Sequence, residues 1–322
     1  MKRLLALLPI LVVSLLSFSQ DIKVREEAVR LLEKADAASA GVNLPNLERT
    51  DTFRVFGGEA GVKEGTFTRV VIQGTGRREE TTFGDYHVVN VITRKGVATV
   101  RTEAMAPPEV RTLMWLTPIN PLVFDDKDVI HRIENREVNG RPSRCIEFDT
   151  VAGQKADANE ICVDVANGAI VIEKLGNDLI ENSEFFSFSG AVLPGRIRYS
   201  FAGALQMEIM QAMAPLTDAT PNVLAAPPNA QMLLYCKTYR RPYGQTMPQP
   251  KPGNGGSDAD VVVRGLIGSD GRIHDAVVQI SERPDLNAEA LNLIHHWVFT
   301  PAVCDGDPST TEASFTLHFQ GR

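Results

Sequence analysis

The chain has 322 residues, of which 43% are hydrophobic and 23% are charged, and this composition is typical of a folded soluble protein with room for two domains. Its formal net charge of -7 opposes binding to nucleic acid, because neutralising phosphates needs a concentrated basic surface. We therefore expect no nucleic-acid partner.

Residues 1–19 have the pattern of a cleaved signal peptide. Two basic residues, Lys2 and Arg3, precede an apolar run over residues 4–18, and small residues follow at positions suited to a signal peptidase. The run is shorter than the roughly 20 residues that a membrane-spanning helix needs, and Pro9 interrupts it. We expect export, with a retained membrane anchor as the alternative.

Residues 20–215 are predicted to form an α+β domain with a large antiparallel sheet. The segment IKVREEAVRLLEKADAASAG repeats apolar residues at helical spacing and stops at Gly41. From about residue 65 to residue 211 the pattern changes to alternating, strand-like runs, with turn signals such as Asn139-Gly140 between them. One helical insertion, PPEVRTLMWLT, separates two groups of strands, and we expect the first helix to pack on the sheet.

The four cysteines are predicted to form two disulfides, because an even count in an exported protein is more naturally a disulfide set than a metal site. RCIEFDT and EICVD are both strand-like, and a turn centred near Gly153 would place Cys145 opposite Cys162. That pairing leaves Cys236 with Cys304. In the chain-entropy model the two bridges contribute roughly 3 and 4 kcal/mol. Four unpaired, buried thiols are the alternative.

The order of a helix, a long meander of strands and an inserted helix resembles the periplasmic lipoprotein-carrier fold, in which a half-open barrel shelters acyl chains. The resemblance rests on order and patterning, without a diagnostic motif. It implies an alternative function for residues 20–215, as a periplasmic carrier of lipid or another apolar ligand.

Residues 216–257 are rich in Pro, Gly and polar residues and are predicted to be a linker. Two strand-like runs follow around Asp270-Gly271, which is a strong hairpin signal because Gly tolerates positive φ. A helix with its predicted N-cap at Asp285 comes next, and the alternating run EASFTLHFQ closes the chain. Residues 258–322 are thus predicted to form a small β-β-α-β domain.

His295 and His296 stand at the end of this predicted helix, in the run LIHHWVF. Adjacent residues on a helix point about 100° apart, so the two imidazoles cannot chelate one ion as histidines four apart can. No HExxH motif, cysteine pair or carboxylate at helical spacing completes a metal site. We predict solvent-facing histidines at a helix end and expect Trp297 and Phe299 to lie in the core.

No catalytic residue, metal site or cofactor is predicted elsewhere, and we expect no enzymatic activity. The chain has no Gly-x-Ser-x-Gly elbow, no phosphate loop of Walker type and no zinc motif. The acidic run FDDKD, residues 124–128, lacks the spacing of a calcium loop and is predicted to be a solvated turn. His87 and His131 lie in strand-like runs and are predicted to be ordinary surface or core residues.

Residues 261–319 closely resemble the C-terminal domain of the TonB family of energy transducers. That family shows a strand, an Asp-Gly turn, a strand that ends in Ser, a Leu-led helix with paired alanines, a Trp-x-Phe-x-Pro-Ala exit, a loop with Gly and Pro, and a last strand. In this sequence those elements are Asp270, Gly271, Ser281, Leu286, Ala288, Ala290, Trp297, Phe299, Pro301, Ala302, Gly306 and Pro308.

The resemblance implies a binding function. Family members are not enzymes; their small domain crosses the periplasm and adds a strand to a short segment of an outer-membrane transporter, by β-augmentation. Carried over here, it implies a periplasmic protein that docks on an outer-membrane transporter or other envelope protein, with energy-coupled transport as the role that the family performs. The implied docking edge is Ser314, Phe315, Thr316, Leu317 and His318. The alternative is that this strand is only part of the sheet.

Three features depart from the family. A signal-like segment stands where a retained membrane helix is usual, a folded domain stands where a long Pro-rich spacer is usual, and YCKTYRRPYG stands where the Tyr-Pro box is usual. These departures put force transmission from an inner-membrane motor in doubt. An anchor that faces the periplasm is the alternative that would restore it.

Overall fold

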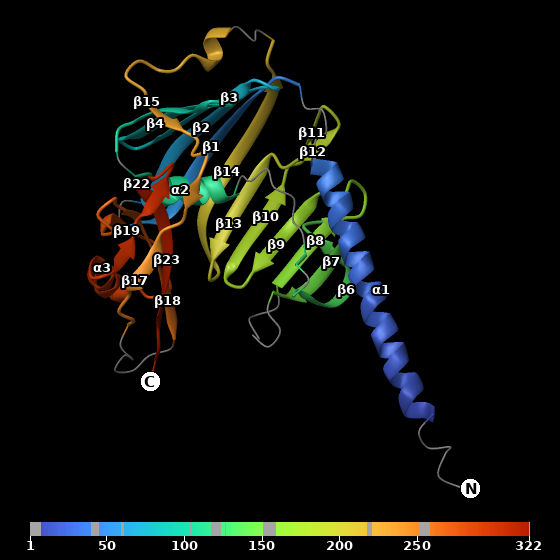
Figure 1. The fold of residues 1–322 in the computed structure, drawn as a ribbon. Coiled ribbons are helices and arrows are strands. Elements are labelled where there is room, and N and C mark those ends of the chain that lie inside the picture. The colour runs from blue at the N-terminus through green and yellow to red at the C-terminus, as the bar shows by residue number, and fades with distance from the viewer. Residues whose placement is uncertain are drawn as a thin grey trace. The chain divides into compact units, whose positions relative to one another are not determined.

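The structure is a computed structural model that describes residues 8–39, 45–58, 61–103, 105–116, 124–125, 127–150, 159–217, 221–250 and 258–321. The chain divides into two compact units, each built from two separate stretches. The first unit contains Met1–Gln73 and Leu116–Ala219, and the second contains Gly74–Trp115 and Thr220–Arg322. The chain is mostly β-structure with few helices, and it contains the large antiparallel sheet that the sequence predicts within an α+β fold (Figure 1).

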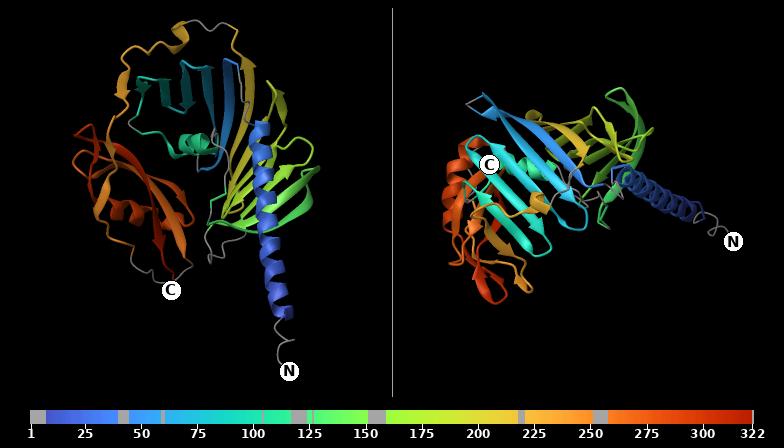
Figure 2. Two further views of the ribbon diagram at one scale, coloured as in Figure 1. Left: turned by 45° about the vertical axis from the view of Figure 1, so that its right-hand side comes forward. Right: turned by 90° about the horizontal axis from the view of Figure 1, so that it is seen from above.

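The first unit is built on antiparallel strands in the order β2-β1-β14-β13-β10-β9-β8-β7-β6, with a small β11-β12 hairpin. The C-terminal part of helix α1 (Leu8–Ser39) lies beside this unit's strands, where it contacts β6, β8 and β12, and its N-terminal part extends away from them (Figure 2). The strands are β1 (Leu47–Gly58), β2 (Gly61–Ile72), β6 (Val129–Val138), β7 (Arg141–Asp149), β8 (Asn159–Asp164), β9 (Ile170–Leu175), β10 (Asp178–Ser183), β11 (Phe186–Phe188), β12 (Ala191–Leu193), β13 (Arg196–Phe201) and β14 (Ala204–Pro215).

The second unit combines strands in the order β15-β5-β4-β3 with a three-stranded sheet in the order β19-β18-β23. Two small sheets, β16-β21-β22 and β17-β20, complete its strand pairing. Its helices are α2 (Pro108–Leu116), η1 (Pro221–Leu224), η2 (Pro284–Leu286) and α3 (Asn287–His295). Its strands are β3 (Gly76–Phe83), β4 (Tyr86–Thr93), β5 (Gly96–Arg101), β15 (Gln231–Leu234), β16 (Tyr239–Arg240), β17 (Tyr243–Thr246), β18 (Ala259–Ile267), β19 (Ile273–Ser281), β20 (Val298–Thr300), β21 (Ala302–Cys304), β22 (Asp307–Ser309) and β23 (Thr311–Phe319).

Helix α1 packs on the sheet through the apolar face that its sequence predicts. Ala28, Leu32 and Ala35 are buried at the helical spacing of one face, and they contact a cluster of sheet residues. That cluster consists of Ile146, Phe148, Ile161 and Val163. The helix begins earlier than the sequence analysis expects, at Leu8, and it ends at Ser39.

Residues 1–7 of the predicted signal peptide lie outside the described residues, and its cleavage stays a prediction. Within the part of the chain that the structure describes, no helix combines the length and the apolar character needed to cross a membrane.

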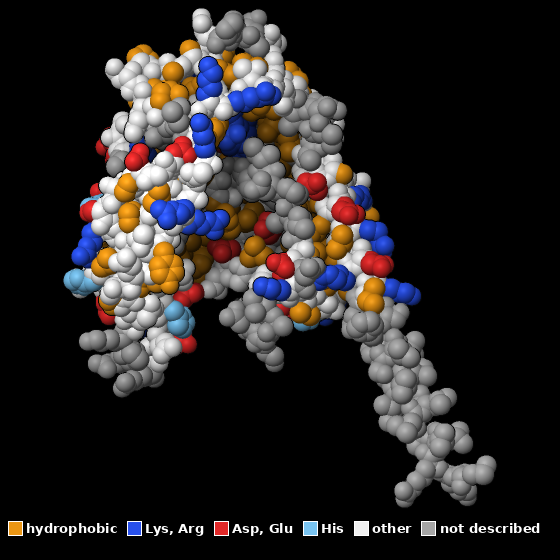
Figure 3. Space-filling model, viewed as in Figure 1, with side chains coloured by type: hydrophobic (Ala, Val, Ile, Leu, Met, Phe, Trp, Pro, Cys, Tyr) orange, Lys and Arg blue, Asp and Glu red, His pale blue; other side chains and the backbone are white. Residues whose placement is uncertain are grey.

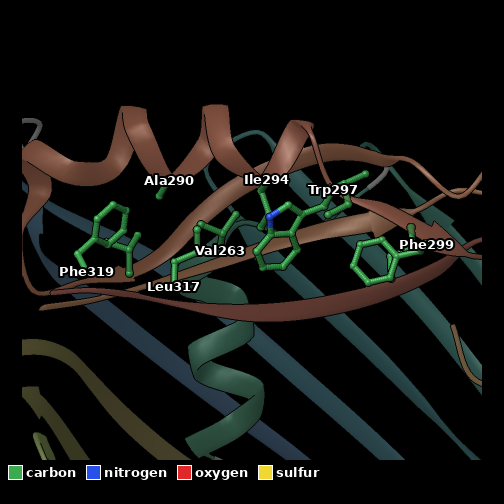
Figure 4. Close-up of a cluster of buried hydrophobic side chains, with 10 residues drawn as sticks. Val263, Ala290, Ile294, Trp297, Phe299, Leu317 and Phe319 are labelled. Carbon is green, nitrogen blue, oxygen red and sulfur yellow. The ribbon is translucent and has the colours of Figure 1, made fainter. Parts of the chain in front are cut away.

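The core of the C-terminal segment lies between α3 and one face of the β19-β18-β23 sheet (Figure 4). Strand β18 buries every second residue, including Val261 and Val263, because successive side chains in a strand point to opposite faces. Helix α3 contributes Ala290 and Ile294, which are both 0% exposed. The predicted core position of Trp297 and Phe299 agrees with the structure, where both are buried.

Both predicted disulfides are present. Cys145 on β7 and Cys162 on β8 are directly paired in the antiparallel register and form one bridge, and Cys236 and Cys304 form the other. Ile146 pairs with Ile161, as the predicted register requires. Residues 151–158, which contain the predicted turn near Gly153, lie outside the described residues.

Of the two disulfides, Cys236–Cys304 is expected to contribute more to the free energy of unfolding, because it joins residues farther apart in the sequence. The variant with Cys236→Ser and Cys304→Ser loses a cross-link between residues 68 apart, so we expect its free energy of unfolding to fall by about 4 kcal/mol. The matched variant with Cys145→Ser and Cys162→Ser loses a cross-link between residues 17 apart, so we expect its free energy of unfolding to fall by about 3 kcal/mol. Urea denaturation followed by circular dichroism measures both, and an equal or reversed order would contradict the expectation.

Two details of the C-terminal segment differ from the sequence analysis. Asp285 is not the N-cap of the helix: it lies inside the short η2 turn, its carboxylate accepts hydrogen bonds from Arg283, and Leu286 occupies the N-cap position of α3. Residues 216–257, predicted to be a linker, contain η1 and the strands β15, β16 and β17, while 218–220 and 251–257 lie outside the described residues. The predicted domain boundaries themselves stay a prediction.

Candidate functional site

Strand β23 lies at one edge of the β19-β18-β23 sheet and contains all five residues of the docking edge that the sequence analysis implies. It pairs with β18 over nine consecutive residues, from Ala259 opposite Phe319 to Ile267 opposite Thr311, without a register shift. Among the described residues, no strand pairs with its other edge. An unpaired edge of this length and regularity offers the geometry that an added strand needs.

The opposite edge of the same sheet, β19, is irregular. Its pairing with β18 shifts register between Val262 and Val263 and again between Arg264 and Leu266. Asp275 within it has a φ of 50°, which is uncommon for a residue other than Gly. Bulges twist an edge and interrupt its row of backbone groups, and proteins use them to block strand addition. Of the two edges, β23 is therefore the one with the regular pairing.

The side chains of β23 divide between two faces of the sheet. Leu317 is buried in the core, and the ring of Phe315 packs edge-on against Trp297 at 5.2 Å between ring centroids. Ser314, Thr316 and His318 are exposed on the other face. The core therefore holds the strand in place from one face, while the other face carries mostly small polar side chains that leave the backbone accessible.

The backbone groups of β23 also divide into two sets. In an antiparallel pair, residues that exchange both hydrogen bonds with the partner strand alternate with residues whose N–H and C=O groups point away from it. Ser314, Thr316 and His318 belong to one set, and Phe315 and Leu317 belong to the other. One of these sets therefore presents its donors and acceptors at the unpaired edge.

Ionic contacts hold the beginning of β23. Glu312 accepts a hydrogen bond from Arg264 on β18 at 3.1 Å and also pairs with Arg111 on α2. The Arg111 side chain is only 9% exposed, and this burial, together with the nearby Arg264, lowers its pKa to about 10. Arg111 also donates to the carbonyl of Ala106. A strand fixed at its start and along its core face presents an edge that needs little further ordering.

His318 lies near the end of β23, and its Nδ1 contacts the carboxylate of Asp260 at 2.8 Å. This hydrogen bond, together with the charges of Asp260, Asp258 and Glu282, raises the pKa of His318 above its ordinary value of 6.5. A raised pKa in the folded state means that protonation stabilises the fold. The contribution is fully present below about pH 6.5 and is lost as the pH rises through the folded-state pKa.

We expect His318→Gln to flatten the dependence of stability on pH. Between about pH 6 and pH 8 the wild-type chain should lose more stability than the variant, and the difference is expected to be small because the side chain is 54% exposed. Thermal unfolding across this range measures it. His295→Gln is the matched control, since His295 is exposed at the end of α3, and a wild-type slope in His318→Gln would contradict the expectation.

The other singled-out residues do not converge on a site in the described part of the chain. His295 and His296 are exposed at the C-terminal end of α3, where His296 is the C-cap residue, as predicted. His87 contacts Glu80 at 3.0 Å, and His131 contacts Asp149 at 2.8 Å on a different unit.

In the acidic run at residues 124–128, hydrogen bonds join Asp125 to Asp128 and join both residues to α1. The carboxylate of Asp128 accepts from the backbone N–H of Asp125, and Arg25 on α1 donates to the carbonyl oxygens of both residues at 2.7 Å. Asp126 lies outside the described residues. The one grouping of metal-type ligands among the described residues is Cys145, Glu160 and Cys162, and its two sulfurs are joined in a disulfide.

Residues 235–250, which we call the strap, are the feature that the sequence analysis misses. The strap runs along the C-terminal segment: Tyr239 pairs with Cys304, Tyr243 pairs with Thr300, and the indole N–H of Trp297 donates to the carbonyl of Pro248 at 2.9 Å. Strands of two and four residues show no readable alternation. Cys236 is the residue from which the sequence could have predicted the strap, because its expected bridge to Cys304 places this stretch beside the C-terminal segment.

The carrier hypothesis concerns the large sheet of the first unit. The face that such a sheet would offer to an apolar ligand is covered, over β6 to β8, by α1 and its buried residues Ala28, Leu32 and Ala35. A bound ligand stays a prediction, which mass spectrometry of the gently purified protein tests by searching for a co-purifying lipid.

Residues 254–320 match the family model of the Gram-negative bacterial TonB protein C-terminal. The match covers the β19-β18-β23 sheet, α3 and the short strands between them. It agrees with the resemblance that the sequence analysis states. Comparison with the curated proteins finds no match.

Solved structures similar to the chain include lipoprotein-carrier domains, as the weaker resemblance names. A putative outer membrane lipoprotein-sorting protein domain from Vibrio parahaemolyticus is 9% identical, and the match covers 61% of this chain and 95% of that chain with a TM-score of 0.39. A LolA superfamily protein from Nitrosomonas europaea is 11% identical, with 61% and 96% covered and a TM-score of 0.39. MucB is 15% identical, with 84% and 97% covered and a TM-score of 0.34.

Proposed function

We propose that this protein is a periplasmic interaction protein that docks on an outer-membrane transporter or another envelope protein by adding a partner strand to β23. The protein acts in this proposal through binding and has no catalytic role. The observation that carries it is the nine-residue, unbulged pairing of β23 with β18 at a sheet edge whose other side is unpaired among the described residues. The match to the TonB C-terminal family model over the same residues supports it.

The chemistry of the edge fits an extended peptide. In β-augmentation the backbone hydrogen bonds supply most of the affinity, and the side chains beside the edge supply selectivity. The exposed face of β23 offers two hydroxyls, on Ser314 and Thr316, and an imidazole, on His318. A partner segment with polar side chains on alternate positions would match this face.

Proline substitution tests the proposal, because proline removes one backbone donor and is tolerated at an edge only where that donor points outward. Ala313→Pro and Ser314→Pro change adjacent residues whose N–H groups point in opposite directions. One variant therefore breaks the β18 ladder and lowers the melting temperature, and the other spares the fold. The variant that keeps the wild-type melting temperature should bind the partner peptide at least about ten-fold more weakly.

Isothermal titration of the full chain with peptides from outer-membrane transporters of the same cell provides the measurement, with scrambled peptides as the control. Unchanged affinity in the stable proline variant would contradict docking at β23. Binding of no peptide by the wild-type chain would contradict the transporter as partner.

A further inference from the structure

The strap lies in a part of the chain whose charge differs from the rest. From residue 219 to residue 257 the sequence contains Lys237, Arg240, Arg241 and Lys251 and no Asp or Glu, which gives this segment a charge of +4. The remainder of the chain therefore carries -11. A basic segment in an acidic protein is an electrostatic feature that attracts anionic surfaces.

The cations of the strap are open to solvent. Lys237, Arg240 and Arg241 are exposed, and no ion pair joins any of them to a described residue. Elsewhere in the described part of the chain, many arginines form ion pairs, such as Arg264 with Glu312 and Arg283 with Asp285. The contrast indicates that the strap presents these charges to something outside the chain.

Exposed aromatic and apolar side chains accompany the cations. Tyr243 is 74% exposed, and the nearby large side chains on and just before the strap are also open to solvent: Met232 at 52%, Tyr235 at 56%, Tyr239 at 49% and Met247 at 43%. Figure 3 shows hydrophobic and basic side chains close together over the region that Figure 1 labels β17 and β23.

The strap is held against the C-terminal segment at several points. The Cys236–Cys304 bridge fixes its beginning, strands β16 and β17 pair with β21 and β20, and the indole of Trp297 holds the carbonyl of Pro248. The side chains are therefore presented by an ordered backbone, so that binding does not have to order the segment first.

We propose that the strap binds the surface of a bilayer that contains anionic phospholipids. Lys and Arg are attracted to anionic headgroups, and Tyr rings favour the boundary between headgroups and acyl chains, where the phenol meets water and the ring meets hydrocarbon. An acidic peptide would use the cations but would leave the exposed Tyr and Met side chains without an apolar partner. The combination therefore favours a lipid surface over an acidic protein.

The full chain tests this with vesicles of equal parts phosphatidylglycerol and phosphatidylcholine, compared with vesicles of phosphatidylcholine alone. Hydrogen exchange should slow in the strap amides on the anionic vesicles only, and added salt should reverse the effect. This readout is local, so the apolar N-terminal run, which every variant shares, does not obscure it.

A matched pair of variants identifies the site. Arg240→Ser with Arg241→Ser should lower the partition onto anionic vesicles about 25-fold, at about five-fold for each cation. Lys63→Ser with Lys127→Ser removes the same charge from two exposed positions of the first unit and should change the partition by less than about two-fold, because neither residue belongs to the strap. Tyr243→Ser should weaken binding without changing its dependence on salt.

Three results would overturn the proposal. These are no exchange protection in the strap on anionic vesicles, equal losses in the two double variants, or binding of polyglutamate in solution without binding to vesicles. The last result would assign the strap to an acidic protein partner. None of these outcomes depends on whether β23 accepts a peptide, so the two proposals succeed or fail separately.

Discussion

Trp297→Ala is expected to lower the free energy of unfolding of the C-terminal segment by about 5 kcal/mol, at the upper end of the range for removing a buried tryptophan. The side chain is 5% exposed, and its ring packs against Phe315 at 5.2 Å and Phe299 at 6.3 Å between centroids. Its indole N–H is also the donor that holds Pro248 of the strap. The substitution therefore leaves a cavity beneath β23 and releases the strap at the same time.

Trp297→Phe is the matched control for this prediction. It keeps an aromatic ring in the core but removes the donor to Pro248, so we expect a smaller loss, of about 1–3 kcal/mol. Urea denaturation followed by far-ultraviolet circular dichroism measures both variants. Tryptophan fluorescence is less suitable, because both variants lose Trp297 and only Trp115 would remain. Equal losses in the two variants would show that the lost hydrogen bond to Pro248, and not the aromatic ring in the core, accounts for the destabilisation.

Asp51→Ala is expected to destabilise the first unit by about 4–5 kcal/mol, because it leaves a buried guanidinium without its counter-charge. Asp51 is 0% exposed, and Arg49 donates to both of its carboxylate oxygens, with distances of 2.6 to 3.0 Å. Burial raises the pKa of Asp51, although its hydrogen bond and Coulomb attraction to Arg49 oppose the shift. The carboxylate thus costs free energy to bury, and its pairing with Arg49, together with the charge of Arg69, offsets that cost.

Removing both partners should cost much less. Arg49→Met with Asp51→Leu replaces the ion pair by apolar side chains of similar size, and we expect a change within about 1 kcal/mol of wild type, since such replacements are often neutral. Denaturation of Asp51→Ala, Arg49→Met and the double variant gives the coupling between the two side chains. A double variant as unstable as Asp51→Ala would contradict this account of the pair.

The elements that the sequence predicts well are those with long, regular periodicity. The register of β7 and β8 follows from alternation in RCIEFDT and EICVD, and the structure pairs Cys145 with Cys162 as that alternation requires. The Asp270-Gly271 hairpin and the buried face of α3 follow in the same way, from turn chemistry and helical spacing. In each case a local pattern agrees with the tertiary contacts, which is why reading the sequence is sufficient there.

The elements that the sequence does not predict depend on contacts between distant residues. The strap consists of strands too short to alternate, and only its pairing with β20 and β21 makes them strands. The assignment of Asp285 as an N-cap is wrong because Pro284 starts a short 3-10 turn that places Leu286 at that position instead. The preference for β23 over β19 as the free edge also needs the structure, since the bulges in β19 appear only in its pairing.

The measurement that tests the account most directly is hydrogen exchange of the full chain with and without a peptide from an outer-membrane transporter. If β23 accepts the peptide as an added strand, one alternating set of its amides, either Ser314, Thr316 and His318 or Phe315 and Leu317, should exchange quickly in the free chain and slowly in the complex. The amides of β19 should not change. Protection confined to β19 or to another element, with β23 unaltered, would contradict docking at this edge.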